Sequence, residues 1–518
     1  MVKRRGVIRP SKKVVLILIL LLLIGSFLYV YFFQREKLLL VLVDLEPGKP
    51  PLSFSYLQKS RFSNIGGVEK ANWIRFFIVW NNIELEKGKY DFSFLDLVVK
   101  RFQKDNKVLV LTILPFANWD QDKCHDDSYI AEFPVPGGMI KVKAGKPCNM
   151  NDYIDFLKVL VERYDGDGVN DMPGLRYPIK YWEIMNEPGM QKSILGLKFF
   201  CGSPEDYLEI LKVSYQTIKQ VDPDAKVLMG GMAGMEKEFV DFWSKIISEA
   251  KDYFDIANVH SINTDEDRED LYLFKFKEFL KSYGVDDKPI WITEAQYGDL
   301  FVPPKDLVAA EKLLVRSTVF AFANGAEKIF HIGNWYEFWK TESTQKVYET
   351  LVNKIDYFDS VEIIKQEYKE TFKGVKTIIG QYKFTIGDHV IYVLWGDSPL
   401  PEELKGKVLK VTNIYGDEKI VENYTEIKLS DSPIYVEIVN KQSSNHTSQH
   451  INLIEFQKLV YPRLSIPNGK ILEEIGKVVE GTRLPIVEAE DNISIVFWEC
   501  NDLVMIKPFS RLGAEVGI

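Results

Sequence analysis

Short apolar runs alternate with longer amphipathic segments along most of the chain. The apolar runs have the length and composition of buried strands. They lie at Leu38–Val43, Trp73–Val79, Val108–Leu114, Lys180–Met185, Lys226–Gly230, Phe254–His260, Pro289–Thr293 and Lys328–Ile332. The amphipathic segments predict helices at Phe94–Lys104, Tyr153–Tyr164, Glu205–Gln220, Lys237–Ala250, Asp270–Tyr283 and Asp306–Ala323. Apolar strands that alternate with helices indicate a parallel sheet buried on both faces, and eight such units favour a (β/α)8 TIM barrel over residues 38–360.

The pattern changes in the C-terminal third of the chain. From about residue 375, apolar and polar positions alternate with a period of two, and turn residues recur at short intervals. This is typical of a small antiparallel β-sandwich-like domain, which we place at residues 375–440. A polar linker follows at residues 441–450. Residues 451–518 contain apolar runs that fit either a small α/β appendage or a tail packed on the β domain.

The N-terminal 33 residues differ from the rest. Residues 1–13 hold six Lys and Arg and no acid, and Val14–Phe33 is a run of 20 residues without a charge. Such a run is long enough to cross the hydrocarbon core as a helix, and the basic flank predicts a cytoplasmic N-terminus. We therefore expect a single-pass signal anchor in the cell membrane at residues 14–33, with the bulk of the chain extracytoplasmic. A cleaved signal peptide is the alternative, but bulky apolar residues directly follow the small pair Gly25-Ser26.

Composition excludes several classes of protein. A hydrophobic fraction of 46% excludes wholesale disorder, and a net charge of −9 argues against nucleic acid as the main partner. Four cysteines in 518 residues cannot form a disulfide scaffold. Aromatic residues reach 13%, which suits a cleft that stacks on sugars, although large cores also use them. Nothing in the sequence indicates a protein partner.

Two predicted strands end in a glutamate. The segments are YWEIMNEPG, which contains Glu187, and WITEAQYG, which contains Glu294. Because the carboxyl ends of barrel strands converge on one mouth, these side chains should face one another across it. A protonated carboxyl beside an ionised one can cleave an acetal, since one donates a proton to the leaving oxygen and the other attacks the anomeric carbon. The alternative for Asn-Glu-Pro alone is a turn with an incidental acid, and the second strand-end Glu favours the chemistry.

With these residues, the sequence from about Val41 to Asn440 resembles the glycoside hydrolases of clan A, of the family 5 and family 39 kind. The resemblance implies retaining hydrolysis of extracellular or envelope poly- and oligosaccharides, with Glu187 as acid/base and Glu294 as nucleophile. It also implies that Asn186 binds the sugar 2-hydroxyl and that Arg75 braces the nucleophile. Glu187 should then have a raised pKa and Glu294 an ordinary one.

Other residues near the predicted strand ends could contact substrate. By resemblance, His260 matches a residue beside the nucleophile and Trp335 an aromatic floor for the sugar. Trp80 and Trp119 follow two early strands and could line further subsites, and Tyr297 could replace a tyrosine that the family carries after His260. For each of these residues a packing role in the core is the alternative.

Two features outside the cleft concern stability. The spacing of Asp165, Asp167 and Asp171 around two glycines suits a structural Ca²⁺ site, and an acidic turn is the alternative. We expect no other cofactor. Cys124 and Cys148 bracket an insertion that a disulfide could close, with Cys201 as a rival partner.

Two other functions stay open at this point. The first is a non-catalytic protein that binds glycan or organises the envelope on a degenerate barrel. The second is a transglycosylase that uses the same residues with a sugar as acceptor.

Overall fold

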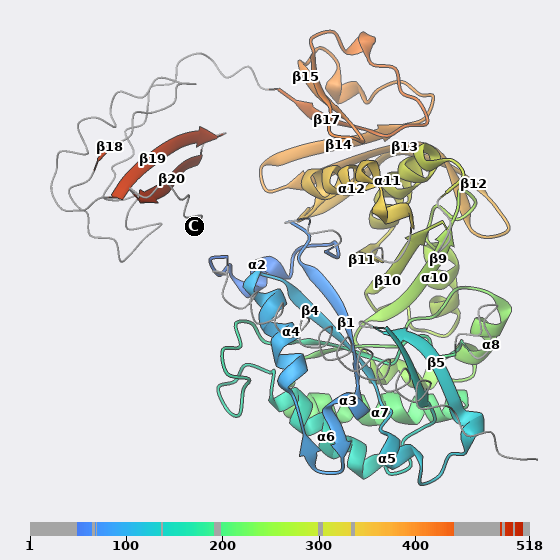
Figure 1. The fold of residues 1–518 in the computed structure, drawn as a ribbon. Helices are drawn as coiled ribbons and strands as arrows, with labels where there is room; N and C mark the ends of the chain where they lie inside the picture. The colour runs from blue at the N-terminus through green and yellow to red at the C-terminus, as the bar shows by residue number, and fades with distance from the viewer. Residues whose placement is uncertain are drawn as a thin grey trace, which may run out of the picture. The chain divides into compact units, whose positions relative to one another are not determined.

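The computed structural model describes residues 49–64, 68, 70–135, 138–190, 198–298, 304–332, 337–439, 487–488, 493–500 and 503–510. The chain divides into two compact units, one that ends at Val439 and one that begins at Asn440. The first unit contains a parallel and an antiparallel β structure (Figure 1). The parallel part holds the candidate site.

Parallel strands in two sheets form the core of the first unit. One sheet has the order β1 (Trp73–Val79), β4 (Val108–Leu114), β7 (Tyr181–Ile184) and β8 (Lys226–Leu228). The other has the order β11 (Ala326–His331), β10 (Ile290–Tyr297) and β9 (Ala257–Thr264). A parallel bridge joins Leu228, the last residue of β8, to Ile256, the residue before β9. On the other side, Phe62 bridges to Ile329 of β11 and Ser63 bridges to Trp73 of β1, so the strands close into a ring.

The first position of the barrel differs from our prediction. Phe62 and Ser63 fill the place between β11 and β1, where we had expected the run Leu38–Val43. That run lies outside the described residues. A bridge of two residues is too short to leave a periodic pattern in a sequence, whereas the apolar run beside the predicted anchor resembles a strand.

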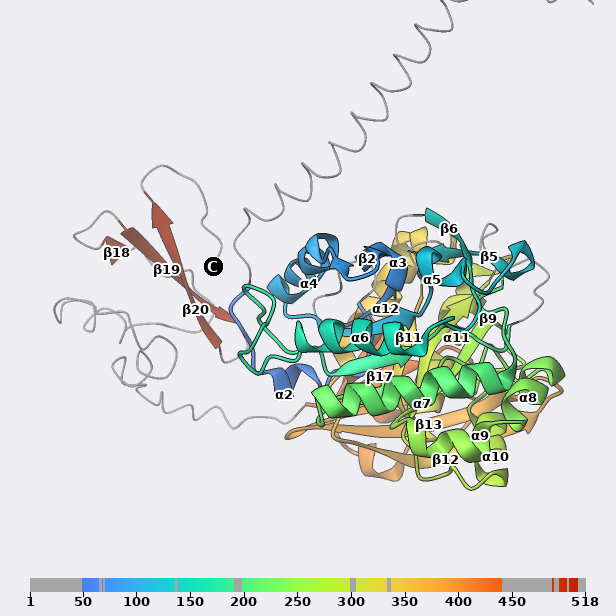
Figure 2. The same ribbon diagram turned by 90° about the horizontal axis from the view of Figure 1, so that it is seen from below.

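Each of the seven named parallel strands is followed by at least one helix on the outside of the ring. The helices are α4 (Ser93–Lys104), α6 (Met150–Glu162), α7 (Pro204–Val221), α8 (Lys237–Ser244), α9 (Ile247–Ala250), α10 (Leu273–Ser282), α11 (Leu307–Ala323) and α12 (Glu342–Ile355). Figure 2 shows α6 and α7 side by side, which agrees with their contacts. Helix α7 begins where the side chains and backbone amides of Ser203 and Asp206 cap one another, with a proline in the first turn.

Short elements lie in the connections between these strands and helices. The helical turns are α2 (Phe54–Leu57), α3 (Trp80–Ile83) and α5 (Asn118–Gln121). Two hairpins are formed by β2 (Glu84–Glu86) with β3 (Lys89–Tyr90) and by β5 (Ile130–Val135) with β6 (Gly138–Lys143). The second hairpin belongs to the long connection after β4.

The amino-terminal end of the ring is closed by packed aromatic side chains. Trp73 and Trp291 lie edge to face with ring centroids 5.2 Å apart. The Nζ atom of Lys328 lies 4.3 Å from the centre of the Trp73 ring and donates to the backbone oxygens of Gln58 and Ser60. Burial lowers the pKa of Lys328 to about 7. With this end filled, the carboxyl ends of the strands are the face open to a functional site.

The antiparallel part is a single sheet of six strands, where the sequence had predicted a sandwich. Its order is β12 (Ser360–Glu370), β13 (Val375–Ile386), β14 (His389–Trp395), β17 (Ile434–Ile438), β15 (Leu409–Asn413) and β16 (Glu418–Val421). Helix α11 contacts both β12 and β13 and lies between the sheet and the barrel (Figure 1). This sheet begins at Ser360, before the predicted boundary at residue 375. Strand β12 is mostly exposed and so lacks the alternation that marks the other strands.

The second unit has three antiparallel strands among its described residues. They are β18 (Val487–Glu488), β19 (Ile493–Cys500) and β20 (Leu503–Ser510). The predicted anchor and the predicted polar linker lie outside the described residues. Within the part of the chain that is described, no helix combines the length and apolarity that crossing a membrane requires.

Candidate active site

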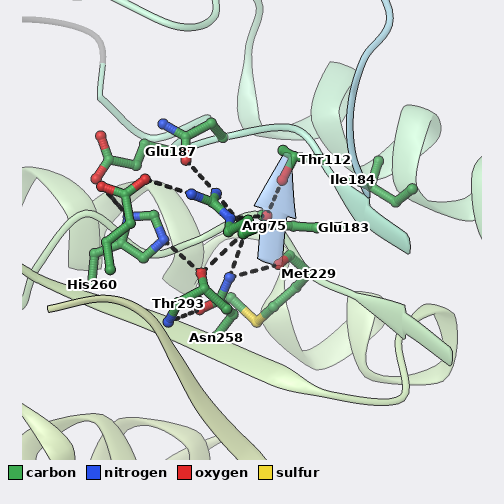
Figure 3. Close-up of polar contacts among 12 residues, drawn as sticks. Arg75, Thr112, Glu183, Ile184, Glu187, Met229, Asn258, His260 and Thr293 are labelled. Carbon is green, nitrogen blue, oxygen red and sulfur yellow. Dashed lines mark hydrogen bonds and ion pairs between the residues drawn. The ribbon is translucent and has the colours of Figure 1, made fainter. Parts of the chain in front are cut away.

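Four side chains, from three strands and from the loop after a fourth, meet toward the carboxyl end of the ring. Arg75 comes from β1, His260 from β9 and Glu294 from β10, and Glu187 lies in the loop directly after β7. Figure 3 shows Arg75, Glu187 and His260 in one cluster, with the carboxyl group of Glu187 directed toward His260. The common direction of the strands brings these residues together, although they are far apart in sequence.

The two glutamates are close neighbours. One carboxylate oxygen of Glu187, one of Glu294 and a ring nitrogen of His260 all lie within 4.8 Å of one another. The Nδ1 atom of His260 lies 2.7 Å from Oε1 of Glu187 and 3.8 Å from Oε2 of Glu294. The expected convergence of the strand-end carboxyls is therefore present in the structure.

Arg75 connects the acidic groups of the site. Its Nη1 donates to Oε1 of Glu294 at 2.6 Å, and its Nη2 donates to Oδ1 of Asn186 at 2.7 Å. Its Nε and Nη2 also donate to Oε2 and Oε1 of Glu183, at 2.5 and 3.0 Å. Burial lowers the pKa of Arg75, but the two carboxylates outweigh it, so the pKa is raised overall and the guanidinium stays charged.

The loop that carries Glu187 has an unusual backbone. Met185 and Glu187 have φ angles of 67° and 41°, in the left-handed region that side chains with a Cβ rarely adopt. Gly230 packs against this loop, and a Cβ there would lie 2.8 Å from the backbone oxygen of Ile184. The turn that aims Glu187 into the site therefore depends on close backbone packing.

The two glutamates differ in their charged partners, although burial raises the pKa of both. Burial raises the pKa of Glu187 to about 8, with Arg75 opposing and Glu183 adding to the shift. Burial also raises the pKa of Glu294, opposed by His260 and Arg75. The expectation of an ordinary pKa for Glu294 is wrong, because that side chain too is largely removed from water. Glu294 nevertheless has an ion pair with Arg75, and Glu187 accepts no bond from that guanidinium among the described contacts.

His260 is a neutral group within the site. Burial lowers its pKa to about 4, although the charge of Glu294 opposes that shift. Its ring lies against Gly231, where a Cβ would be only 2.0 Å from Nε2. Only glycine at this position leaves room for the ring.

Sequence reasoning missed Glu183. This fully buried carboxylate accepts hydrogen bonds from Arg75, Thr112 and Asn258. A signal was present, because an acid within an apolar strand needs a cation, and Arg75 lies within another apolar strand. Glu183 and Arg75 thus form the buried charged base of the site.

Two of the predicted substrate residues belong to the core instead. Trp80 is fully buried, and its ring packs against Trp119 and the side chains of α6, with ring centroids 5.3–5.6 Å apart. Tyr297 is also fully buried, and its hydroxyl lies 2.7 Å from that of Ser317 on α11. Both side chains point toward the helices that surround the ring, so we assign them to packing.

Of the two other aromatic residues, Trp119 is described by the structure and Trp335 is not. Trp119 is partly buried, donates to the backbone oxygen of Glu84 at 2.8 Å and has Nζ of Lys123 4.5 Å from its ring centre. One face of this indole is therefore occupied by a cation. Trp335 lies outside the described residues, and its role as a sugar floor stays a prediction.

The acidic loop lies at the opposite end of the ring, between α6 and β7. Single carboxylate oxygens of Asp165, Asp167 and Asp171 lie within 4.8 Å of one another. Backbone amides of the same loop donate to these carboxylates, as Gly168 does to Asp171 at 2.8 Å. Burial raises the pKa of Asp165 to about 6, and the neighbouring acids add to the shift. Structural calcium at this loop stays a prediction.

Cys124 and Cys148 form a disulfide in the long connection after β4. Cys201, which the sequence left as a rival partner, has a free thiol that donates to the backbone oxygen of Tyr129. The disulfide therefore joins the two ends of the insertion that carries the β5–β6 hairpin.

Comparison with known proteins gives distant structural similarity only. No family model matches the sequence, and no curated protein matches it. A family 39 glycoside hydrolase from Bacteroides cellulosilyticus WH2 is similar in structure, with a TM-score of 0.48 and 14% identity over 76% of this chain and 80% of that one. A monomeric β-xylosidase from Caulobacter crescentus CB15 has a TM-score of 0.46 and 13% identity, over 76% and 99% of the two chains. An α-L-arabinofuranosidase from Thermotoga maritima has a TM-score of 0.46 and 12% identity, over 76% and 93%.

Proposed function

We propose that this protein is a retaining glycosidase, which cleaves O-glycosidic bonds by double displacement with Glu294 as nucleophile and Glu187 as acid/base. The observation that carries the proposal is the pair of buried carboxyls, whose nearest oxygens lie within 4.8 Å and whose environments differ. One belongs to an ion pair with Arg75, and the other has a pKa raised to about 8. The pKa of Glu294 is raised as well, but the ion pair with Arg75 favours its ionised form, as the nucleophile role requires.

The first step needs an ionised nucleophile with a free oxygen. Arg75 donates to Oε1 of Glu294, which leaves Oε2 as the oxygen that can attack the anomeric carbon. The attack forms a glycosyl ester on Glu294 and breaks the bond to the leaving oxygen. Glu187 supplies the proton that this oxygen takes up, since it is largely protonated at neutral pH.

The second step reverses the role of Glu187. As a carboxylate it accepts a proton from the attacking water, whose oxygen bonds to the anomeric carbon and releases Glu294. The spacing of the carboxyls supports this route. Retaining enzymes hold them ~5–5.5 Å apart, whereas an inverting enzyme needs ~6.5–9.5 Å to admit a water between them.

Arg75 and Asn186 complete the proposed site. Asn186 accepts from Arg75 through Oδ1, so its amide NH₂ group is the part available for the sugar 2-hydroxyl. We propose a poly- or oligosaccharide outside the cytoplasm as substrate, with residues 14–33 as the membrane anchor. The length and basic flank of that segment support the anchor.

A screen on glycosides tests the function. The full-length protein in detergent is incubated with aryl glycosides and β-linked polysaccharides, in parallel with Glu294→Gln. We expect release of the aglycone by the wild-type protein only, with retained anomeric configuration in the first product seen by NMR. A 2-deoxy-2-fluoro glycoside should leave its sugar on Glu294.

Four other results would contradict the proposal in different ways. Inverted product would exclude the double displacement, and label on another residue would exclude Glu294. Glycan binding without turnover by a folded protein would favour a binding function. Transfer to added sugars that outpaces hydrolysis would identify a transglycosylase.

A further inference from the structure

A continuous chain of hydrogen bonds runs behind the two glutamates, from Glu183 through Asn258, Thr293 and His260 to Glu187 (Figure 3). We propose that Asn258 and Thr293 are positioning residues that fix the tautomer of His260, with its proton on Nε2, and thereby hold a proton on Glu187. This inference rests on the proposed function, because it assigns the means by which the acid is kept protonated.

Glu183 determines which groups donate and which accept along these hydrogen bonds. This carboxylate already accepts from Nε and Nη2 of Arg75 and from Oγ1 of Thr112, and an ionised carboxylate can only accept. Its contact with Asn258, at 2.7 Å, must therefore come from the amide nitrogen Nδ2. The amide oxygen of Asn258 consequently faces Thr293, whose backbone N–H also donates to it at 3.3 Å.

Thr293 must donate its hydroxyl proton to Asn258 and accept a hydrogen bond from His260. Its Oγ1 lies 2.8 Å from Oδ1 of Asn258, and an amide oxygen cannot donate, so the threonine hydroxyl must be the donor. The other acceptor in reach, Oε1 of Glu183 at 3.4 Å, would use the same proton. Because its only hydroxyl proton is already donated, Thr293 can only accept a hydrogen bond from Nε2 of His260, which lies 2.9 Å away.

The tautomer of His260 determines whether Glu187 donates or accepts. A neutral imidazole carries one proton, and with that proton on Nε2 its Nδ1 is an acceptor. Oε1 of Glu187 lies 2.7 Å from Nδ1, too close for two acceptors without a proton between them. Glu187 must therefore be the donor, in its protonated form.

The charged groups around this contact are consistent with that assignment. Arg75 of β1, Glu183 of β7 and Glu294 of β10 are the charged or titratable groups of the described chain that act on Glu187 and His260. Burial of His260 disfavours the imidazolium, the form that could otherwise donate to a Glu187 carboxylate.

This chain of hydrogen bonds also affects how Glu187 regains a proton in the second step of the reaction. Once Glu187 has given its proton to the leaving oxygen, its carboxylate faces the lone pair of Nδ1. That contact is repulsive, and it is relieved when Glu187 takes a proton from the attacking water. A fixed tautomer thus keeps Glu187 in the protonated form before the first step, and it favours the return of a proton to Glu187 in the second.

The test compares Thr293→Val with Thr293→Ser in the full-length protein. Valine keeps the shape of the side chain and removes the hydroxyl, and serine restores the hydroxyl. With ¹⁵N-labelled histidine, NMR distinguishes protonated from unprotonated ring nitrogens, and His260→Asn identifies the signal among six histidines. We expect a proton on Nε2 and none on Nδ1 in the wild-type protein and in Thr293→Ser.

In Thr293→Val the imidazole is free to place its proton on Nδ1 and to donate to Glu187. The alkaline limb of kcat/KM should then move about 1 pH unit lower.

A proton on Nδ1 in the wild-type protein would overturn the inference, as would equal pH profiles for the valine and serine variants. If Thr293→Val does not fold, the wild-type spectrum still decides the tautomer. The spectrum needs no substrate. An inactive protein with the proton on Nε2 would refute the proposed function alone, and an active glycosidase with the proton on Nδ1 would refute this inference alone.

Discussion

Arg75 holds both carboxylate oxygens of Glu183, with Nε 2.5 Å from Oε2 and Nη2 3.0 Å from Oε1. A two-point contact of this kind fixes the plane of the guanidinium. Its remaining nitrogen, Nη1, then points to Glu294, 2.6 Å away. The orientation of the proposed nucleophile therefore depends on a buried acid that does not take part in bond making.

Glu183→Gln should impair both stability and turnover. It leaves Arg75 with one charged partner fewer in a buried site, and breaking such a pair costs about 3–5 kcal/mol of unfolding free energy. We also expect kcat/KM to fall by roughly a hundredfold, because a misplaced positioning group costs about that much. Chemical unfolding and kinetics on the same preparations measure the two effects.

Asp431→Asn is the control, since its ion pair with Lys312 is largely exposed and should contribute less than about 1 kcal/mol. Wild-type values for Glu183→Gln would contradict the role of this pair.

Glu294→Gln should abolish turnover and keep sugar binding. The amide preserves the shape of the side chain but cannot form the glycosyl ester, so we expect kcat to fall by about a thousandfold or more. Calorimetry with a substrate fragment measures binding in the same variant. Glu266→Gln, which changes an exposed carboxylate, should retain full activity. Residual activity near the wild-type level in Glu294→Gln would show that the nucleophile is another group.

The pH dependence of kcat/KM should show an alkaline limb near the pKa of Glu187, which is raised to about 8. Activity requires the protonated form, so it should be lost as the pH rises through that value. In Glu187→Gln the remaining activity should lack this limb. A limb that persists in the variant would have to be assigned to another group.

The same shift has a consequence for stability. Because the folded protein binds a proton at Glu187 more tightly than the unfolded chain does, the contribution of this group to stability is present below its ordinary pKa. It is lost as the pH rises toward about 8. Thermal unfolding of wild-type protein and Glu187→Gln between pH 5 and about 9 checks the sign, and the variant should gain relative stability at the alkaline end.

Gly231→Ala should displace His260. Its new methyl group would lie 2.0 Å from Nε2, closer than any real contact, so the ring must move away from Thr293 and Glu187. We expect loss of activity and a lower alkaline limb. Gly189→Ala is the matched control, since it also lies near Glu187 but its methyl group would meet Phe242 at 3.3 Å. Equal behaviour of the two variants would show that the ring position does not matter.

The sequence could predict the meeting of Glu187 and Glu294, because parallel strands present their ends at one face whatever the details of packing. It misplaced Trp80 and Tyr297. Trp80 lies on the helical turn α3, and the register of β10 shifts between Ala295 and Tyr297, so a simple alternation from Glu294 does not place Tyr297. In β7, by contrast, alternation places Glu183 on the opposite side of the strand from its two apolar neighbours, which could have identified it.

Other features could not be predicted from the sequence. The bridge at Phe62 and Ser63 is too short to have a period, and the turn at Met185 and Glu187 follows no glycine signal. Those φ angles arise from packing against Gly230 and β4, which a local sequence does not contain.

The left-handed backbone at Glu187 has an evolutionary consequence. Asparagine and glycine adopt such a φ angle more readily than glutamate does, so selection for stability alone would replace this residue. Glu187→Asn should therefore melt at a higher temperature than the wild-type protein while losing turnover. Under the proposed function, a descendant of this chain that no longer needed the chemistry would be expected to drift first at this position.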